Sequence, residues 1–537
     1  MSWRKRLVVV AAVIFGMVLF TACNSETGGE SSNNENNDNN ESASNDGNNN
    51  NNNNNNENEA NSNENEEVAE EDRPTITMMI SLHTPEVPGD KILNLVQDAT
   101  NVNLDIEWVP DNNYSEKLNT AFATGTLPEV VGVGMDQMDQ FKEAIRDDQF
   151  WEVGPYLDEY ENLGKLKDTI VENTKVNGKV YGLYQGRPLS RQGIIYRKDW
   201  ADNLGLSAPE TTEEFYEMAR AFTEDDPNES GEDDTTGLTD RNDLIYGAFK
   251  TVASWFGTPN YWGEEDGELL PEFMFPEYVE AMDFMKDLRE NAYINQDFPV
   301  TSKTDQQEML KNGTAGLYVG SMGDIMSLYE DAKDLNSDVE FDVTNYIEGP
   351  DGEYSVWAIP GFGAQMLFPK SAIETEEQLE EILAFYDQLM TPEVSNLFQW
   401  GIEGEHYELK DGKADISSEK GALHEREVLP FNSILIGEPE TNGHYESTFT
   451  YEPRQKAEDL YKDNEDYLIN DPTVTLESET DIEQGERLQE IINDATYNYM
   501  LGEIDEDGFE QQIEEWKNQG GDDIIKEYNE SFQEVEE

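Results

Sequence analysis

The sequence predicts an α/β protein that folds as two lobes or domains around parallel sheets. Beyond Arg73, stretches with strand character alternate with stretches of helical periodicity, which is the order that forms parallel βαβ units. About 460 residues follow Arg73, more than a single hydrophobic core usually holds. Hydrophobic residues make up 36% of the chain and aromatic residues 10%, so each lobe can bury a core.

The first elements lie between residues 75 and 134. β-Branched and apolar residues at 75–82 predict a strand. A helix is expected next, because Ile92, Leu95, Val96 and Ala99 recur at the spacing of one helical face. In order, we expect strands at 75–82, 102–109 and 129–134 and helices at 91–101 and 114–124, the second of which Gly125 ends.

A second group of elements begins at residue 178. Residues 178–183 read as a turn entering a strand, and 193–200 as a strand that runs into a helix. Thr211 and Glu214 have the spacing of a capping box and predict the start of a further helix. Its buried face is expected to hold Phe215, Met218, Ala219 and Phe222.

The N-terminus has the features of a bacterial lipoprotein signal. Arg4, Lys5 and Arg6 precede an uncharged stretch at 7–22, and Cys23 follows as the only cysteine of the chain. The four residues 20–23 resemble the cleavage site at which a cysteine is acylated, although Phe20 stands where leucine is usual. We expect residues 1–22 to be a cleaved signal peptide and Cys23 to carry palmitate-type lipid. The alternative is a structural cysteine in an uncleaved anchor, for which the stretch is short.

Residues 23–73 are expected to form a lipid-anchored, disordered tether rich in Asn and Glu. This stretch includes the run 48–56 of asparagines and has too few apolar residues to offset chain entropy. A coil of this length reaches roughly 40 Å. The alternative, a prion-like aggregation tract, is disfavoured by the interspersed acidic residues.

The chain is strongly anionic. It has 35 Lys and Arg against 117 Asp and Glu, a net charge of −82, and only 14 of the acidic residues lie between 24 and 72. Such a surface repels nucleic acid and anionic membranes. Two interpretations remain open, halophilic adaptation to high salt or a cation-storing surface.

Four stretches resemble one known family. They are 114–118 with 125–131, 187–206, 312–318 and 401–407, and the tail from 502 to 521 adds to them. Together they resemble the extracellular solute-binding lipoproteins of bacterial carbohydrate ABC transporters, the family 1 solute-binding proteins, including bacillus-type and alginate-oligosaccharide-binding members. The stretch 187–206 is the most specific of the four.

The resemblance implies a type II periplasmic-binding-protein fold, in which two α/β lobes close on a ligand and the chain crosses the hinge several times. The first lobe would comprise 74–190 and about 360–400, and the second 191–359 and about 401–537, including C-terminal helices. Crossings are expected at 187–193, near 360–368 and near Trp400.

As a function, the resemblance implies a monomer, lipid-anchored at the outer face of the cell membrane, that delivers a carbohydrate, in particular an oligosaccharide, to the membrane subunits of an ABC permease.

Residues 226–234 read as a calcium loop. Oxygen ligands at loop positions 1, 3, 5 and 9, a carbonyl at 7 and a glycine at 6 suit one hard cation. Gly237 replaces the usual Glu at position 12, and Thr235 offers no carboxylate where alginate-binding relatives have one. The alternative is a solvated acidic loop. The expected ligands of a structural Ca²⁺ are Asp226, Asn228, Ser230, the Glu232 carbonyl and Asp234.

The ligand site should combine aromatic rings, which stack on sugars, with polar groups that bind hydroxyls. At least two of seven candidates are expected to line the cleft. The alternative role is packing in the core for each Trp and an ion pair with a carboxylate for each Arg. The candidates are Arg187, Arg191, Trp255, Tyr261, Trp262, Trp357 and Trp400.

Catalytic signals are weak. No carboxylate pair stands out among 117 acidic residues, the four histidines lack metal-ligand spacing, and no phosphate-binding glycine loop is present. We therefore expect no enzyme. A surface-anchored polysaccharide-degrading enzyme, a sensor or adhesin on the same fold, and a peptide ligand remain alternatives.

Overall fold

The computed structural model describes residues 73–416 and 418–536. The expected signal peptide, Cys23 and all but the last residue of the expected tether lie outside the described residues. Within the described part, no helix has the length and the apolar run that a membrane span requires.

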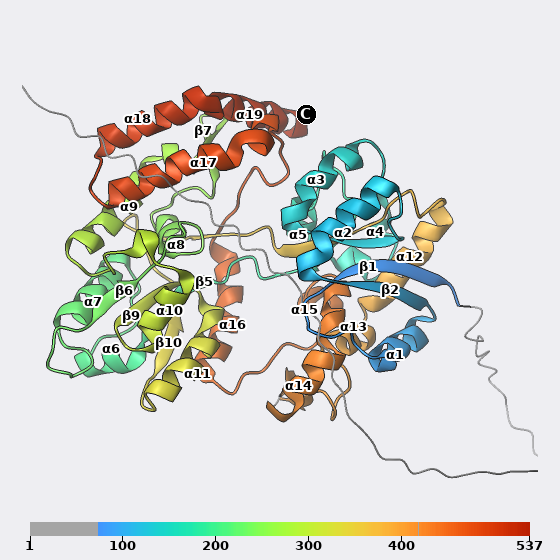
Figure 1. The fold of residues 1–537 in the computed structure, drawn as a ribbon, viewed down its shortest axis with the longest axis horizontal. Helices are drawn as coiled ribbons and strands as arrows, with labels where there is room; N and C mark the ends of the chain where they lie inside the picture. Colours follow the sequence, from blue (N-terminus) through green and yellow to red (C-terminus); the bar gives the residue numbers. More distant parts are fainter. Residues whose placement is uncertain (1–72, 417, 537) are drawn as a thin grey trace, which may run out of the picture. The chain divides into compact units, whose positions relative to one another are not determined.

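The first sheet has five strands in the order β2-β1-β3-β12-β4 (Figure 1). β1 runs parallel to β2 and β3, whereas β12 is antiparallel to β3 and β4. The predicted parallel βαβ start is therefore present. The strands are β1 (Thr75–Leu82), β2 (Asn103–Pro110), β3 (Val130–Gly134), β4 (Gly182–Gly186) and β12 (Phe362–Leu367), and the first helices are α1 (Asp90–Thr100) and α2 (Asp111–Thr124).

The buried faces of these helices differ partly from the prediction. α1 buries Ile92, Val96 and Thr100, whereas the predicted Leu95 and Ala99 are exposed. The buried residues of α1 are four positions apart, because the helix contacts the core along one narrow stripe. α2 buries Tyr114, Leu118 and Ala121 and ends at the predicted Gly125, whose φ of +66° suits a glycine C-cap.

The second sheet has four strands in the order β10-β5-β9-β6. β6 is parallel to β9, and β5 is antiparallel to β9 and β10. Its strands are β5 (Gln192–Arg197), β6 (Thr236–Thr239), β9 (Ala315–Ser321) and β10 (Phe341–Thr344), with helices α6 (Lys198–Leu204), α7 (Thr212–Glu224), α8 (Ala248–Trp255), α9 (Pro276–Glu290), α10 (Lys303–Lys311) and α11 (Ile325–Leu335).

The start of α7 follows the prediction in part. The Oγ1 atom of Thr211 accepts a hydrogen bond from the Glu214 amide at 3.1 Å. The Glu214 side chain accepts from the amide of Glu210 rather than from that of Thr211. The four apolar residues predicted for the inner face of α7 are all buried.

The remaining helices and strands complete both lobes. Around the first sheet they are α3 (Met135–Arg146), α4 (Gly154–Leu157), α5 (Asp168–Asn173), α12 (Glu376–Leu389), α13 (Pro392–Gln399), β13 (Glu408–Lys410), β14 (Lys413–Asp415), α14 (Ser418–Glu427) and α15 (Pro439–Asn442). The others are β7 (Trp262–Glu265), β8 (Glu268–Pro271), β11 (Val356–Trp357), α16 (Glu452–Asn464), β15 (Leu468–Ile469), α17 (Glu479–Met500), α18 (Glu506–Trp516) and α19 (Asp522–Glu536).

The C-terminal helices pack on the second sheet. Leu488, Ile492 and Trp516 belong to the hydrophobic cluster that also contains Ile194 and Leu317 of that sheet. Figure 1 shows α17, α18 and α19 lying together beside α9. This packing accords with the expected second lobe, whose boundaries remain a prediction.

The segment 428–436 packs differently from what the lobe prediction implies. Val428, Phe431 and Ile434 lie in the hydrophobic cluster of the first sheet, together with Ile76 and Ile80. We therefore propose that residues 401–442 belong to the first lobe and not to the second. The third crossing is then the segment 443–451 before α16, and not the region of Trp400.

The other two crossings connect the sheets within one compact unit, to which all described residues belong. The segment 187–191 joins β4 to β5, and the return path runs through 358–361 into β12. The backbone amide of Arg187 donates to the Gly361 carbonyl at 2.8 Å, so these two crossings lie side by side.

Candidate ligand-binding site

The first-lobe cavity, of about 310 Å³, lies at the carboxyl ends of the parallel strands. Ser81 lies near the end of β1 and His83 follows it, Asp111 follows β2, and Gly134 ends β3. Ligands of open α/β sheets bind at this edge, because the strands all end there and leave a crevice. The remaining lining residues include Tyr114, Ser115, Gln137, Gln185, Arg187, Gly363, Met366 and Ser433.

The second-lobe cavity, of about 580 Å³, has the equivalent position on the second sheet. Arg241 follows β6 and Ser321 ends β9, while the crossing residues 189–192 and 358–360 line its base. Met135, at the start of α3 in the first lobe, also lines it. Arg187 lines both cavities, and we refer to the two together as the cleft.

Arg187 and Arg191 line the cleft without carboxylate partners. Among the described residues, no carboxylate lies within ion-pair distance of either guanidinium, and both residues are exposed. Arg241, also in the cleft, instead pairs with Asp243 at 3.2 Å. The alternative that the two hinge arginines serve internal ion pairs therefore does not hold.

A glycine leaves space for the Arg187 side chain. A Cβ atom built on Gly363 would lie 2.5 Å from Cζ and 2.7 Å from Nη2 of Arg187. The guanidinium thus passes directly over the backbone of β12. Only glycine allows this approach without displacing the charged group.

Tyr261 is held in the cleft in a strained conformation. Its φ is +60°, which is rare for a bulky residue, and the residue is 36% exposed. The Glu272 carboxylate accepts a hydrogen bond from the Tyr261 amide at 3.0 Å and one from the buried Lys250 ammonium at 2.6 Å. Lys250 Nζ in turn lies 3.5 Å from the centre of the Tyr261 ring. Lys250 and Glu272 thus hold the Tyr261 ring in place.

Tyr246 and Trp357 form an aromatic pair in the same cavity. Their ring centres are 5.8 Å apart, and Tyr246 is 54% exposed whereas Trp357 is 2% exposed. Trp357 Nε1 donates to Thr251 Oγ1 at 3.0 Å, which anchors the inner ring. The sequence does not indicate Tyr246 as a cavity residue, because nothing in it distinguishes this tyrosine from the others.

Three predicted tryptophans lie outside the cleft. Trp255 is 1% exposed and packs on Phe215 at 5.3 Å, because every residue of α8 is buried. Trp262 packs against Tyr528 of α19 at 4.9 Å. Trp400 is 5% exposed, donates from Nε1 to the Tyr445 carbonyl and lines a different pocket. These three tryptophans therefore do not line the two cavities, whereas Arg187, Arg191, Tyr261 and Trp357 line the second-lobe cavity; which of the seven candidates bind a ligand stays a prediction.

Hydroxyl-binding groups occupy both halves of the cleft. In the first lobe, Asp111 accepts from Ser81 and faces His83 Nδ1 at 2.7 Å. In the second, Asp324 accepts from the Tyr318 hydroxyl at 2.9 Å and lies 3.7 Å from Lys303 Nζ. Desolvation raises the pKa of the buried Asp471 carboxyl at the base of this cavity. Such carboxylates and amides suit the hydroxyls of a sugar.

Comparison with known proteins identifies the family. Residues 85–385 match the family described as bacterial extracellular solute-binding protein. The chain belongs to this family. The solute-binding protein is also 42% identical over 461 residues to the polygalacturonan/rhamnogalacturonan-binding protein YtcQ of Bacillus subtilis, covering 86% of this chain and 91% of YtcQ. Lipoprotein LipO of the same organism is 34% identical, with 86% and 92% covered.

Solved structures share the fold. An extracellular solute-binding protein from Bifidobacterium longum subsp. infantis superimposes with a TM-score of 0.67 at 14% identity, covering 87% of this chain and 99% of its own. The Streptococcus pneumoniae substrate-binding protein FusA in complex with kestose gives 0.60 at 19% identity, covering 86% and 99%. The two-lobed α/β fold expected from the sequence is thereby confirmed, and these relatives are binding proteins.

The predicted calcium loop lies between α7 and β6, outside the cleft. The Asp234 carboxylate accepts hydrogen bonds from Asn228 Nδ2 at 3.0 Å and from Ser230 Oγ at 3.1 Å. Asp226 accepts from the Gly231 amide at 3.0 Å, and Ser230 Oγ lies 3.3 Å from the Glu232 carbonyl. The predicted ligands thus face one another, and Gly231 has a φ of +76°. The donor set of oxygens fits Ca²⁺.

A second acidic group does not fit a metal. Glu405, His406 and Glu427 lie close together. His406 Nδ1 accepts the Ile402 amide at 3.0 Å, so the ring proton sits on Nε2, which faces Glu427 at 3.3 Å. A protonated Nε2 leaves no lone pair for an ion.

Proposed function

We propose that the protein is the extracellular substrate-binding subunit of an ABC importer and that its ligand is an acidic oligosaccharide built from uronate residues. The observation that carries the proposal is the pair of arginines, Arg187 and Arg191, that face the cleft without a carboxylate partner. Among the described arginines, Arg289 and Arg487 also have no carboxylate partner, but they contact the Leu501 carbonyl and glutamine side chains and lie outside the cleft. A carboxylate-bearing ligand supplies the missing partner, and arginine binds carboxylates through paired hydrogen bonds.

The aromatic residues account for the sugar part of the ligand. Tyr246 and Tyr261 present exposed rings to the cavity, and sugar rings have apolar faces that stack on such surfaces. The strained φ of Tyr261 accords with a functional position. The name of the relative YtcQ, a polygalacturonan- and rhamnogalacturonan-binding protein, supports the same ligand class.

Transport then requires only binding and release. The lobes close around the oligosaccharide, and the closed form delivers it to the membrane subunits of the permease. Closure is driven by the greater affinity of the closed state for the ligand, since a ligand shifts a conformational equilibrium only through such a difference. No covalent step is involved.

Calorimetry tests the ligand class. Trigalacturonate should bind, and galactotriose, which lacks the carboxylates, should bind at least tenfold more weakly. Arg191→Gln should weaken trigalacturonate binding by about 10- to 150-fold, the value of one charge-assisted hydrogen bond of about 1.5–3 kcal/mol. Arg487→Gln on α17, whose guanidinium contacts Gln484 and Gln519, is the matched control and should change nothing. Equal binding of both trisaccharides would refute the uronate class.

An enzyme on the same fold is the competing function. Its test is turnover of dyed polysaccharides by the purified protein, and hydrolysis that disappears with one carboxylate substitution would favour it. Absence of binding across an oligosaccharide panel, with an unchanged scattering radius, would argue for a sensor or adhesin. Permease genes beside the coding gene support import, and a sensor kinase gene alone supports signalling.

Lipidation of Cys23 completes the proposal. The family is extracellular and the relative LipO is named a lipoprotein, which supports an anchor at the outer face of the membrane. Cys23→Ser should release the protein into the medium and abolish incorporation of labelled palmitate. Retention of the variant in the membrane fraction would contradict the anchor.

The loop 226–234 is proposed to hold a structural Ca²⁺. The mutual approach of Asp226, Asn228, Ser230, Asp234 and the Glu232 carbonyl supports this role. The ion would order the connection between α7 and β6 and take no part in ligand capture.

A further inference from the structure

A third cavity, which we call the hinge pocket, lies beside the crossing segments. Its volume is about 350 Å³, at the lower end of the range of small-molecule sites, roughly 300–1,000 Å³. The end of β4, residues 437–447 and α16 surround it, so both lobes contribute to its wall. Gln185 pairs with Gly437 beyond the edge strand β4, which places the pocket past the end of the first sheet.

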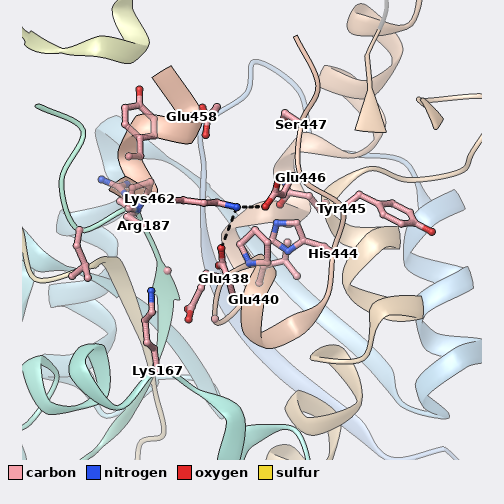
Figure 2. Close-up of a pocket in the computed structure, with 18 of the residues that line it drawn as sticks. Lys167, Arg187, Glu438, Glu440, His444, Tyr445, Glu446, Ser447, Glu458 and Lys462 are labelled. Carbon is pink, nitrogen blue, oxygen red and sulfur yellow. Dashed lines mark hydrogen bonds and ion pairs between the residues drawn. The ribbon is translucent and has the colours of Figure 1, made fainter. Parts of the chain in front are cut away.

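Ion pairs cross the hinge pocket between the lobes. Lys462 of α16 pairs with Glu446 and lies 3.7 Å from Glu440 of α15, and Figure 2 shows its side chain extending to both. Lys167 Nζ pairs with Glu465 at 2.8 Å. Both lysines are therefore engaged, and carboxylates outnumber basic groups along the wall. Arg187 is the third basic residue of the wall and has no carboxylate partner, but six carboxylates face these three basic groups, so the wall as a whole disfavours an anionic ligand.

Three buried polar atoms of the pocket wall have no hydrogen-bond partner. They are the donor Gln455 Nε2 and the acceptors Glu438 Oε1 and Asn432 Oδ1. The other Glu438 oxygen accepts from the Tyr184 hydroxyl at 2.9 Å. A buried polar group without a hydrogen-bond partner destabilises the fold. A pocket with several such groups therefore favours a ligand that both donates and accepts hydrogen bonds.

Apolar and aromatic side chains also line the hinge pocket, beside the charged residues Arg187, Glu458 and Asp459. Trp400, Tyr445 and Leu435 contribute to it. His444 Nδ1 lies 2.6 Å from Asn442 Oδ1, so Nδ1 carries the proton and Nε2 remains an acceptor. Desolvation lowers the pKa of His444 to about 4, which keeps the ring neutral. A ring with an apolar face and a rim of hydroxyls satisfies both kinds of surface.

We propose that the hinge pocket is a second saccharide site, which takes one or two neutral sugar rings. The hydroxyls of the sugar would accept from Gln455 and donate to Glu438 and Asn432, and the aromatic side chains would cover an apolar face. This site goes beyond the proposed capture of a uronate oligosaccharide, because it takes a neutral sugar and is a separate cavity that adjoins the cleft at Gln185 and Arg187.

The neutral sugar can come from two sources. Gln185 and Arg187 line both the hinge pocket and the first-lobe cavity, so the two sites adjoin. One source is a separate small saccharide. The other is a neutral branch on the acidic oligosaccharide held in the cleft. The chemistry recognised is the same, and the experiment separates the two.

The first arm uses free sugars and full-length protein, both without trigalacturonate and saturated with it. Ligand-observed NMR should show saturable binding of galactobiose or rhamnose that trigalacturonate does not displace. Gln455→Leu should weaken this binding about two- to tenfold, the value of one neutral hydrogen bond. The variant removes a buried donor that lacks a partner, so its melting temperature should not fall. Gln511→Leu on the exposed side of α18 is the matched control and should leave binding unchanged.

The second arm compares trigalacturonate with and without a neutral galactose branch. If free sugars do not bind but the branch raises affinity in the native protein and not in Gln455→Leu, the branch is the source. The inference is overturned if neither arm responds to Gln455→Leu, or if galactosamine, a cation, binds the pocket more tightly than the neutral sugars. Loss of trigalacturonate binding alone would instead count against the proposed function, because the free sugars are also measured without it.

Discussion

Gly363→Ala should separate ligand affinity from stability. The new Cβ would lie 2.5 Å from Cζ and 2.7 Å from Nη2 of Arg187, whereas carbon contacts are optimal at about 3.5–4 Å. The guanidinium must therefore move by about 1 Å or more. Because it ends a flexible side chain, and because Gly363 is not among the positive-φ glycines, the fold tolerates the methyl group. We expect the free energy of unfolding to change by less than about 1 kcal/mol.

The affinity should change much more. Displacing Arg187 removes about one charge-assisted hydrogen bond, about 1.5–3 kcal/mol, which corresponds to about 10- to 150-fold weaker trigalacturonate binding. Calorimetry measures the affinity and urea unfolding measures the stability. Gly421→Ala in α14, where a Cβ has 4.0 Å of clearance, is the control: it should stabilise the helix and leave the affinity unchanged. Native affinity in Gly363→Ala would show that Arg187 does not contact the ligand from this position.

Three further predictions follow from charge. The net charge of −82 repels an anionic ligand at long range, and salt screens this repulsion. The association rate constant of trigalacturonate, measured by stopped flow, should therefore rise roughly threefold or more from low to high salt. A rate constant that falls with salt would contradict the uronate class. Chelation of Ca²⁺, or Asp226→Asn, should lower the melting temperature and leave the affinity nearly unchanged, and a melting temperature insensitive to both would refute the loop assignment. Desolvation raises the pKa of Glu438 to about 6, so the folded state binds the proton more tightly and this group's contribution to stability is lost as the pH rises through 6. Glu438→Gln should remove that loss in denaturation curves between pH 4.5 and 7, and an unchanged pH dependence would show that Glu438 is not its source.

The sequence predicted the local elements better than their environment. Periodicity located α2 and α7, because an apolar stripe at helical spacing has few other solutions. It could not tell the cleft from the core. Trp255 and Trp357 are both nearly fully buried, yet only Trp357 borders the cavity, and that difference depends on contacts between distant segments.

The arginines could be singled out for a physical reason. Arg187 and Arg191 stood out because basic residues are scarce in this chain and because they lie between two predicted strands. Their lack of carboxylate partners, however, is a property of the tertiary structure. The return of residues 428–436 to the first core was likewise hidden, since a short apolar stretch does not indicate which of two cores it joins.

The position of Arg187 and Arg191 within a crossing segment has a consequence for how this protein can evolve. The residues proposed to bind the charge of the ligand belong to a segment that connects the two sheets, and the Arg187 amide donates a hydrogen bond to the Gly361 carbonyl of the second connection. A substitution that alters the preferred ligand charge therefore also alters the stiffness of the joint. On the proposed function, ligand specificity and lobe closure are therefore coupled. A change to a ligand of different charge would need compensating substitutions in the connecting segments.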